Sequence, residues 1–194
     1  MGDIKVIAGL ARGRSIKSFK DDLSVRPILA RIKKSLFDIL RNDLPDCHFL
    51  DLYAGTGAVG IEAVSRGAKH TVFVDADSKC VNIIKENLKH LNFEDKASVY
   101  QINILGGLGG LKGKFDIVFM GVPYKDKNKL PLFLVGPTLD MVTKADLLKD
   151  SSLIIAQHHK KEDVVSNDKF EVVREERYGD TVISFLKIKR SDLC

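Results

Sequence analysis

From position 48 onward, short runs of hydrophobic residues alternate with longer segments in which apolar residues recur at helical spacing. The hydrophobic runs predict five strands, at residues 48–53, 70–75, 97–102, 115–120 and 152–157. The spacing in the other segments predicts helices with a break near Gly136 and Pro137, at residues 58–66, 78–91, 104–111 and 128–148. Because strands and helices alternate, we expect an α/β fold with a mostly parallel sheet covered on both faces.

The two ends of the chain follow a different pattern. Residues 5–8 and 15–19 are short extended runs around a turn with two arginines, which predicts an N-terminal β-hairpin with a basic tip. The next segment begins after a proline and keeps helical spacing, which predicts a helix over residues 28–40. Residues 170–177 and 181–189 flank a Tyr-Gly-Asp turn signal, so we expect a second β-hairpin at the C-terminal end.

Composition narrows the class of protein. The chain has 194 residues, 44% hydrophobic and 29% charged, which is typical of a globular protein with one domain or one domain and an appendage. The sequence holds no apolar run of about 18 residues and no long apolar N-terminal region, so we expect neither a membrane span nor export. Cys47, Cys80 and Cys194 fit neither a disulfide framework nor a zinc motif, which favours a cytoplasmic protein without a metal.

Positive charge is concentrated near the N-terminus. Residues 1–42 carry ten Lys/Arg and four Asp/Glu, a balance of +6, whereas the whole chain carries +5. Such a segment is either a solvated basic surface or an arm that binds a polyanion, since clustered cations neutralise phosphates and release counterions. We therefore divide the chain into a basic extension at residues 1–42 and a main domain at residues 43–194.

A cofactor-binding pattern lies at the start of the main domain. The first predicted strand ends near Asp51, a turn with Gly55 and Gly57 follows, and a helix begins directly after it. Asp75 ends the next strand at the distance of about 20 residues that dinucleotide-binding proteins also show. A nicotinamide dehydrogenase and an S-adenosylmethionine (SAM) methyltransferase both use this arrangement. The C-terminal hairpin favours the methyltransferase, because two mononucleotide-binding halves do not end in one.

The residue types of this pattern suit the parts of SAM. Asp51 would orient the ammonium group at the methionine end of the cofactor, or else serve only as a turn-forming residue. Asp75 would accept hydrogen bonds from the ribose hydroxyls, and Asp77 would cap the following helix. Asn103 would bond the adenine amino group, or else act as a helix N-cap. The candidate cofactor-binding residues are Asp51, Ala54, Gly55, Gly57, Asp75, Ala76, Asn103 and Ile104.

A candidate catalytic tetrad follows the fourth strand of the main domain. It consists of Gly121, Val122, Pro123 and Tyr124, and amino-group methyltransferases carry (Asp/Asn)-Pro-Pro-(Tyr/Phe) at this strand end. In that motif, the acceptor and a backbone carbonyl bond the two hydrogens of a poorly nucleophilic amine, and the aromatic ring stacks on the base. In-line positioning of the amine and the methyl group supplies much of the rate. Here the acceptor and the first proline are replaced by Gly121 and Val122.

Further motifs extend over most of the chain. They are Ile7-Ala-Gly9, Arg12-Gly-Arg14, Arg26-Pro27, Leu36-Phe37, the string A-G-T-G-A-V-G-I-E-A-V-S-R-G-A from Ala54 to Ala68, Phe73-Val-Asp75, Phe115-Asp-Ile-Val-Phe119, Pro123-Tyr124 and Tyr178-Gly-Asp-Thr181. With these motifs, residues 4 to about 189 resemble the RsmD-type methyltransferases, which modify a guanine N2 in bacterial 16S ribosomal RNA. The family has a catalytic Asp where this chain has Gly121, and usually Thr where it has Ile28.

The resemblance implies a fold, a cofactor and a substrate. The expected fold is the Rossmann-like methyltransferase fold, with a seven-stranded, mostly parallel sheet, a C-terminal antiparallel hairpin and an additional N-terminal β-hairpin. The expected cofactor is SAM, and the expected partner of the monomer is 16S ribosomal RNA in the small ribosomal subunit. The N-terminal segment would contact this RNA through cations on its surface, for which the candidates are Arg12, Arg14, Arg26, Arg31 and Lys33.

Three functions follow from the sequence. The first is direct methyl transfer from SAM to a guanine N2, with Gly121 slowing the step or with a displaced acceptor such as Asp126. The second is an RNA-binding or ribosome assembly protein that keeps an inactive cofactor site. A dehydrogenase is the third, and it lacks a recognisable acid–base pair for hydride transfer.

Overall fold

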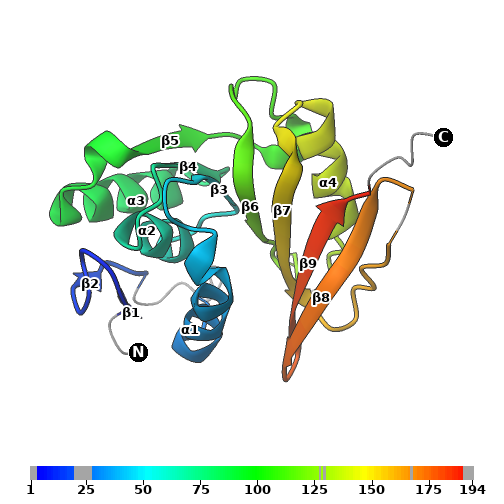
Figure 1. Ribbon diagram of the computed structural model, residues 1–194, viewed down its shortest axis with the longest axis horizontal. Helices are drawn as coiled ribbons and strands as arrows, with labels where there is room; N and C mark the ends of the chain where they lie inside the picture. Colours follow the sequence, from blue (N-terminus) through cyan, green and yellow to red (C-terminus); the bar gives the residue numbers. More distant parts are fainter. Residues whose placement is uncertain (1–3, 20–27, 127, 129, 167, 190–194) are drawn as a thin grey trace.

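A seven-stranded sheet forms the centre of the computed structural model (Figure 1). The strand order is β5-β4-β3-β6-β7-β9-β8, in which β3 to β7 are parallel and the last two strands are antiparallel. The strands are β3 (His48–Leu52), β4 (His70–Asp75), β5 (Ala97–Gln101), β6 (Phe115–Gly121), β7 (Leu148–His159), β8 (Phe170–Tyr178) and β9 (Thr181–Ile188). The structure describes residues 4–19, 28–126, 128, 130–166 and 168–189. It confirms the predicted Rossmann-like methyltransferase fold.

The strand order identifies the edge at which a ligand is expected. From β3 the chain passes outward through β4 to β5, then returns to the other side of β3 as β6. Ligands of open α/β sheets bind beyond the carboxyl ends of the strands at such a reversal. The carboxyl ends of β3 and β6 are therefore the expected position of the site.

Helices cover both faces of the sheet. The described residues contain the helices α1 (Ala30–Ile39), α2 (Ala58–Ser65), α3 (Ser78–Leu91) and α4 (Val135–Lys144), and the short 3-10 turns η1 (Leu40–Asn42), η2 (Glu94–Lys96) and η3 (Ile104–Gly106). Because side chains alternate along a strand, Phe49 packs with α1 and α2, whereas Leu50 packs with α4 on the opposite face. The predicted two-sided sheet is thus confirmed.

Two helix predictions were wrong in extent. The segment 104–111 contains only the 3-10 turn η3 and then irregular backbone, in which Gly107 has a φ of +121°. Four glycines in this segment disfavour a helix, although Leu108 and Leu111 are buried by contacts with the sheet. Helix α4 covers only part of the predicted range 128–148.

The predicted break near Gly136 and Pro137 was also wrong. Both residues lie in the first turn of α4, where a proline removes no internal hydrogen bond. Strand β7 begins at Leu148, earlier than expected, because the sheet pairing extends back to a contact with Phe115 across an irregularity in the register.

The N-terminal hairpin is confirmed but shorter than predicted. Its strands β1 (Ile4–Lys5) and β2 (Ser15–Ile16) form two residue pairs. The amides of Ile7 and Ala8 bond to α2 instead of extending the hairpin. The hairpin thus packs against the helices that follow the cofactor loop.

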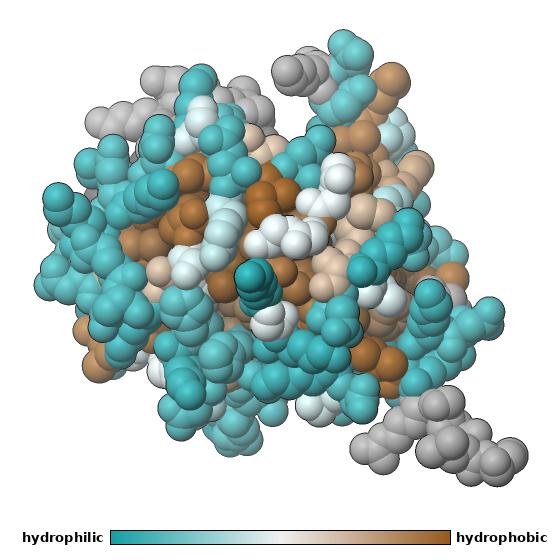
Figure 2. Space-filling view, turned by 90° about the horizontal axis from the view of Figure 1, so that it is seen from above, coloured by the Kyte–Doolittle hydropathy of each residue, from teal (hydrophilic) through white to brown (hydrophobic). Residues whose placement is uncertain are grey.

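The surface of the molecule has both hydrophobic and hydrophilic regions. On the face shown in Figure 2, hydrophobic surface lies near the middle and hydrophilic side chains dominate the border. Leu130 and Phe133, in the segment between β6 and α4, are more than half exposed, at 61% and 53%. Among the described residues, no helix has the length and apolar character that crossing a membrane requires.

Candidate active site at the carboxyl edge of the sheet

The glycine loop and the candidate tetrad begin side by side. Strands β3 and β6 pair in parallel up to Leu52 and Met120, so the residues that follow them emerge at the same edge. A Cβ atom placed on Gly121 would lie 3.8 Å from the carbonyl oxygen of Tyr53. The two motifs that the sequence separates by about 70 positions therefore form one site.

Asp51 is a buried carboxyl group at the floor of this site. Its side chain is 1% exposed, and Oδ2 accepts a hydrogen bond of 2.8 Å from the backbone N–H of Gly60. The pKa of Asp51 is raised to about 8, mainly by burial; the Gly60 bond opposes this rise and the charge of Asp75 contributes to it. The second carboxyl oxygen accepts no hydrogen bond from a described residue, so it is available to a cationic group.

The loop itself requires small residues and unusual backbone angles. Gly55 and Gly57 have φ values of +56° and +77°, and Tyr53 also has a positive φ, of +58°. A Cβ on Gly60 would lie 2.3 Å from the ring of Phe73, which leaves no room for a side chain at that position. The chain therefore makes a close turn into α2 and leaves the first amides of the helix without intrahelical partners.

Asp75 closes the loop from the neighbouring strand. Its Oδ2 accepts a bond of 2.8 Å from the Gly55 amide, and its Oδ1 accepts one of 3.0 Å from the Asp77 amide. Asp77 accepts a bond of 2.8 Å from the Lys79 amide and caps α3, as predicted. A carboxylate has room for about four hydrogen bonds, so Asp75 keeps acceptor capacity for a ligand.

The remaining candidate cofactor residues border the same edge. Ala76 and Asn103 are exposed, whereas Ile104 is buried in the core next to them. The side chain of Asn103 makes no capping hydrogen bond to η3. Of the two roles expected for Asn103, the helix cap is therefore not made, and its side chain is available for a bond to the adenine amino group.

The tetrad residues have distinct environments. Val122 is buried and Pro123 is exposed. The hydroxyl of Tyr124 lies 3.2 Å from the Oγ1 of Thr181, to which it donates, and accepts a bond of 3.3 Å from the Nε2 of Gln157. These bonds fix the aromatic ring beside β7 and β9, where Tyr124 is half-buried.

The structure assigns Asp126 to the loop after the tetrad. Its Oδ1 accepts hydrogen bonds from the amides of Asn128 and Leu130, at 2.9 and 2.8 Å. This carboxylate thus shapes a tight turn, which gives no support to its proposed role as a displaced acceptor for the amine.

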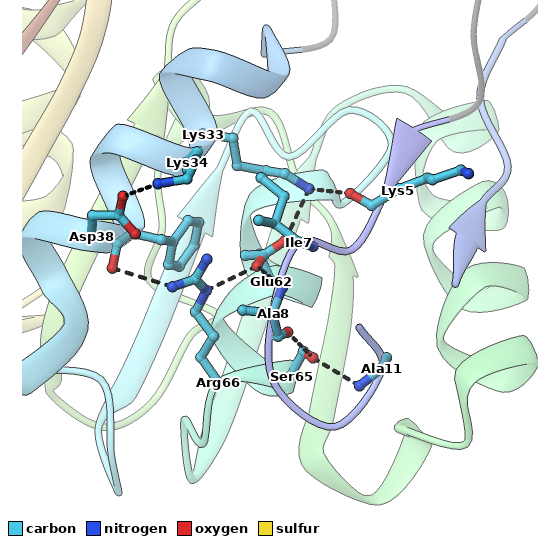
Figure 3. A network of polar contacts seen from close by, with 11 residues as sticks. Lys5, Ile7, Ala8, Ala11, Lys33, Lys34, Asp38, Glu62, Ser65 and Arg66 are labelled. Carbon is cyan, nitrogen blue, oxygen red and sulfur yellow. Dashed lines mark hydrogen bonds and ion pairs between the residues drawn. The ribbon is translucent and has the colours of Figure 1, made fainter. Parts of the chain in front are cut away.

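A buried ionic network joins the N-terminal extension to α2 (Figure 3). Glu62 has no exposed surface and accepts bonds from the amides of Ile7 and Ala8, at 2.9 and 3.0 Å. It also pairs with the Nζ of Lys33 at 3.0 Å and the Nε of Arg66 at 2.8 Å. All these donors converge on one carboxylate, which holds the hairpin and α1 against α2.

The expected role of Lys33 needs correction. We expected this lysine to meet RNA phosphates, but its side chain is 2% exposed and its ammonium also donates to the carbonyl of Lys5 at 2.9 Å. Burial lowers the pKa of Lys33, and the adjacent Glu62 opposes this effect. Lys33 is thus a cation of the interior and is not presented to a ligand on the surface.

The other predicted RNA contacts differ in their surroundings. Arg12 and Arg31 are exposed. Arg14 is exposed too, but its guanidinium donates to the carbonyls of His90 and Leu91 at the end of α3. Arg26 lies outside the described residues.

Sequence reasoning missed the role of Asn87. This buried amide on α3 accepts a bond of 2.7 Å from the Lys17 amide and donates to the carbonyls of Lys17 and Thr56, both at 3.1 Å. It therefore connects the end of the N-terminal hairpin to the glycine loop. The signal was present, because a polar residue at position 87 falls on the apolar side of α3, between Ile84 and Leu91.

A second set of missed contacts fixes the loop to α4. The hydroxyl of Tyr53 lies 2.8 Å from the Oγ1 of Thr138, and burial raises the pKa of Tyr53. Glu162 is buried and accepts a bond of 2.7 Å from the Val135 amide at the start of the helix. Within the described ranges, no group of three or more potential ligands could hold a metal ion.

Known proteins of one family share the sequence pattern of this chain. A family model described as "Conserved hypothetical protein 95" matches residues 4–187. The chain is also 31% identical over 163 residues to ribosomal RNA small subunit methyltransferase D of Buchnera aphidicola subsp. Acyrthosiphon pisum, which covers 84% of this chain and 81% of that protein. The chain belongs to the RsmD-type methyltransferase family.

Other relatives match this methyltransferase over nearly its whole length. YlbH of Bacillus subtilis is 31% identical over 188 residues, covering 95% of this chain and 98% of YlbH. The solved structure of yhhF from Escherichia coli has a TM-score of 0.80 and covers 98% of this chain and 100% of that chain. At 24% identity, this second likeness shows the shared fold.

Proposed function

We propose that this methyltransferase transfers the methyl group of SAM to a guanine N2 of 16S ribosomal RNA in the small subunit. The observation that carries the proposal is the position of the tetrad beside the glycine loop, with Gly121 next to Tyr53 at the ends of adjacent strands. A cofactor on the loop and a base on Tyr124 would meet across this edge.

The residues of the loop fit SAM. Asp51 would hold the ammonium group, Asp75 the ribose hydroxyls and Asn103 the adenine amino group. The loop backbone at Gly55 and Gly57 would approach the cofactor closely, and Ala54, Ala76 and Ile104 would border it. When bound, SAM supplies a methyl group activated by its sulfonium. The chain itself positions the reactants and needs no covalent intermediate.

The tetrad would position the base. The ring of Tyr124, fixed by Thr181 and Gln157, would stack on the guanine, and Pro123 would border it. Backbone carbonyls at Gly121 and Val122 would accept hydrogen bonds from the exocyclic amine in place of the missing carboxylate. Alignment of the amine with the methyl group then provides the rate.

The basic extension would bind the RNA. Arg12, Arg14 and Arg31 are exposed cations of residues 1–42, and Arg26 belongs to the same segment. Phosphate neutralisation by such cations releases counterions and makes affinity depend on salt. Family membership and the relative named ribosomal RNA small subunit methyltransferase D support RNA as the substrate.

A methyl-transfer assay tests the proposed function. We expect labelled methyl groups to pass from SAM to 16S ribosomal RNA in small subunits from cells that lack this protein. Digestion of the product should yield N2-methylguanine. Transfer to a different base or to protein alone would contradict the proposed substrate.

Asp51 gives a prediction on pH. Because its pKa in the folded protein is about 8 rather than the ordinary 3.8, the carboxyl is mostly protonated at pH 6 and half ionised at pH 8. Only the ionised form attracts the ammonium of SAM, so we expect the affinity for SAM to rise up to about fiftyfold between these pH values, in proportion to the ionised fraction of Asp51. Calorimetric titration at pH 6, 7 and 8 measures this change.

The variant Asp51→Asn is the matched control. Its amide oxygen can still accept the Gly60 bond, but it does not ionise, so its weaker affinity should not vary between pH 6 and 8. Without ligand, the native protein should also lose stability as the pH rises from about 4 to about 8, because Asp51 charges more readily in the unfolded chain. Identical pH profiles for both proteins would show that Asp51 does not face the cofactor.

Gly121 supports a second candidate, an RNA-binding protein without catalysis. The absence of the carboxylate acceptor is the observation that favours it. In that case the protein would bind small-subunit RNA in the assay above and transfer no methyl group, whatever the time of incubation.

A further inference from the structure

A basic groove lies between α1 and β8, and Arg31 is the one residue of its lining that the proposed function already uses. It is a hollow of about 630 Å³, and Figure 1 shows α1 beside the β8–β9 hairpin. Helix α1 and the turn after it provide most of the lining, and β8 provides one arginine. The lining residues are Arg31, Lys34, Ser35, Asp38, Ile39, Arg41 and Arg174.

The sequence of α1 creates one wall of this groove. Ile32, Leu36 and Phe37 are buried against the sheet, which turns the opposite side of the helix outward. The cations and the acid of the lining then recur at intervals of three and four residues, and so lie along one stripe. From residue 31 to residue 41, a helical path extends over about 15 Å, which is long enough for more than one phosphate.

A hydrogen bond fixes the second wall. The hydroxyl of Tyr178, the last residue of β8, donates to the Oγ of Ser35 at 2.6 Å. The guanidinium of Arg174 also lies 5.9 Å from the ring centroid of Phe185. Two segments about 140 positions apart thus meet in a defined geometry.

Half of the cations in the groove lack an acidic partner in the part of the chain that the structure describes. Four cations line it with one carboxylate, that of Asp38, which pairs with Lys34 at 2.6 Å. Arg174 pairs with Glu176, a neighbour on β8, at 2.7 Å. Arg31 and Arg41 form no ion pair with any described residue. Two guanidinium groups therefore have donors available for an anion with several oxygen atoms.

A chain of contacts links the groove to the tetrad. Tyr124 contacts Thr181, Thr181 pairs with Tyr178 across the hairpin, and Tyr178 holds Ser35 on α1. A polymer whose base stacks on Tyr124 would thus have this groove next to it.

We infer that the groove between α1 and β8 binds the phosphate backbone of the RNA beside the target guanine. The inference rests on the proposed function, which supplies the RNA. It adds Lys34, Arg41 and the C-terminal Arg174 to the contact surface, none of which belongs to the N-terminal hairpin.

Salt dependence of RNA binding tests the inference. The variant Arg41→Gln/Arg174→Gln removes one cation from each wall, and an unmodified 16S ribosomal RNA transcript is the probe. Each lost phosphate contact should lower the slope of log affinity against log salt by about 0.7–0.9, so we expect a total decrease of about 1.4–1.8. The affinity for SAM should stay unchanged.

A matched double variant controls for the loss of positive charge. Lys69→Gln/Lys112→Gln removes two exposed lysines at the amino edge of the sheet, before β4 and β6. It should keep the native slope. An equal decrease in both double variants, or no decrease in the groove variant, would overturn the inference.

Two combinations of results from the methyl-transfer and salt-dependence experiments distinguish this inference from the proposed function. If the native protein transfers methyl groups and the groove variant keeps the native slope, the proposed function stands and the inference about the groove is wrong. If the slope decreases in the groove variant but the native protein transfers no methyl group, the groove binds RNA and the proposed enzymatic function is wrong. If the groove variant loses affinity for small subunits but not for the transcript, an acidic protein is the occupant and the RNA inference is wrong.

Discussion

Replacement of Gly121 by Asp is expected to raise the rate of methyl transfer to guanine N2 by about 10–10³-fold, the range for one positioned polar group. The new carboxylate would accept a hydrogen bond from the amine mainly as its nitrogen becomes pyramidal, so the gain belongs to the chemical step. The affinity for SAM should not increase. Single-turnover rates on undermethylated small subunits measure the effect.

The structure leaves room for this side chain. Gly121 is not one of the described residues with a positive φ, so its backbone accepts a side chain without strain. A Cβ there would lie 3.2 Å from the ring of Phe119. That ring must shift by a few tenths of an ångström. Gly121→Ala introduces the same crowding without an acceptor and serves as the control.

Three results bear on the assignment. The Ala variant should be no faster than the native protein. Tyr124→Ala should be slower, since base–aromatic stacking contributes about 1–3 kcal/mol. A native protein that is already as fast as Gly121→Asp would show that the amine acceptor lies elsewhere.

Removal of the Glu62 carboxylate is expected to cause the largest loss of stability. Glu62→Ala leaves the ammonium of Lys33 buried without a counterion and leaves the amides of Ile7 and Ala8 without an acceptor. Breaking a buried ion pair in this way costs about 3–5 kcal/mol. Urea unfolding followed by circular dichroism measures the loss.

Asp38→Ala is the control, because it removes a solvent-exposed ion pair of α1, the helix that carries Lys33. Its unfolding midpoint should stay close to that of the native protein. Hydrogen exchange at Ile7 and Ala8 should accelerate in Glu62→Ala only. Similar midpoints for the two variants would mean that the buried network does not stabilise the fold.

The core of the fold was predictable because burial of both sheet faces leaves a strong mark on the sequence. Phe49, Leu50 and Leu52 are apolar on either side of the sheet, and the turn at Gly55 and Gly57 tolerates few other residues. Local pattern therefore located the strands, the glycine loop and the carboxyl edge. The same reasoning placed Asp77 correctly as a helix cap, since capping depends on neighbours in sequence.

The failures depended on contacts that are distant in sequence. Lys33 has the composition of a surface residue and is buried only because Glu62 reaches it from another helix. Leu108 and Leu111 kept helical spacing, but the sheet buries them in an irregular segment rich in glycine. The groove at Arg174 could not be inferred either, because its walls come from opposite ends of the chain.

The position of Asn87 restricts recombination between relatives. The side-chain amide of Asn87 forms hydrogen bonds with the backbone of Lys17 and with the backbone of Thr56. A chimaera that takes α3 from a relative without an amide side chain at this position would leave the N–H of Lys17 and the buried carbonyl of Thr56 without these partners. In homologous exchange, the hairpin, the glycine loop and α3 must therefore be inherited as one block.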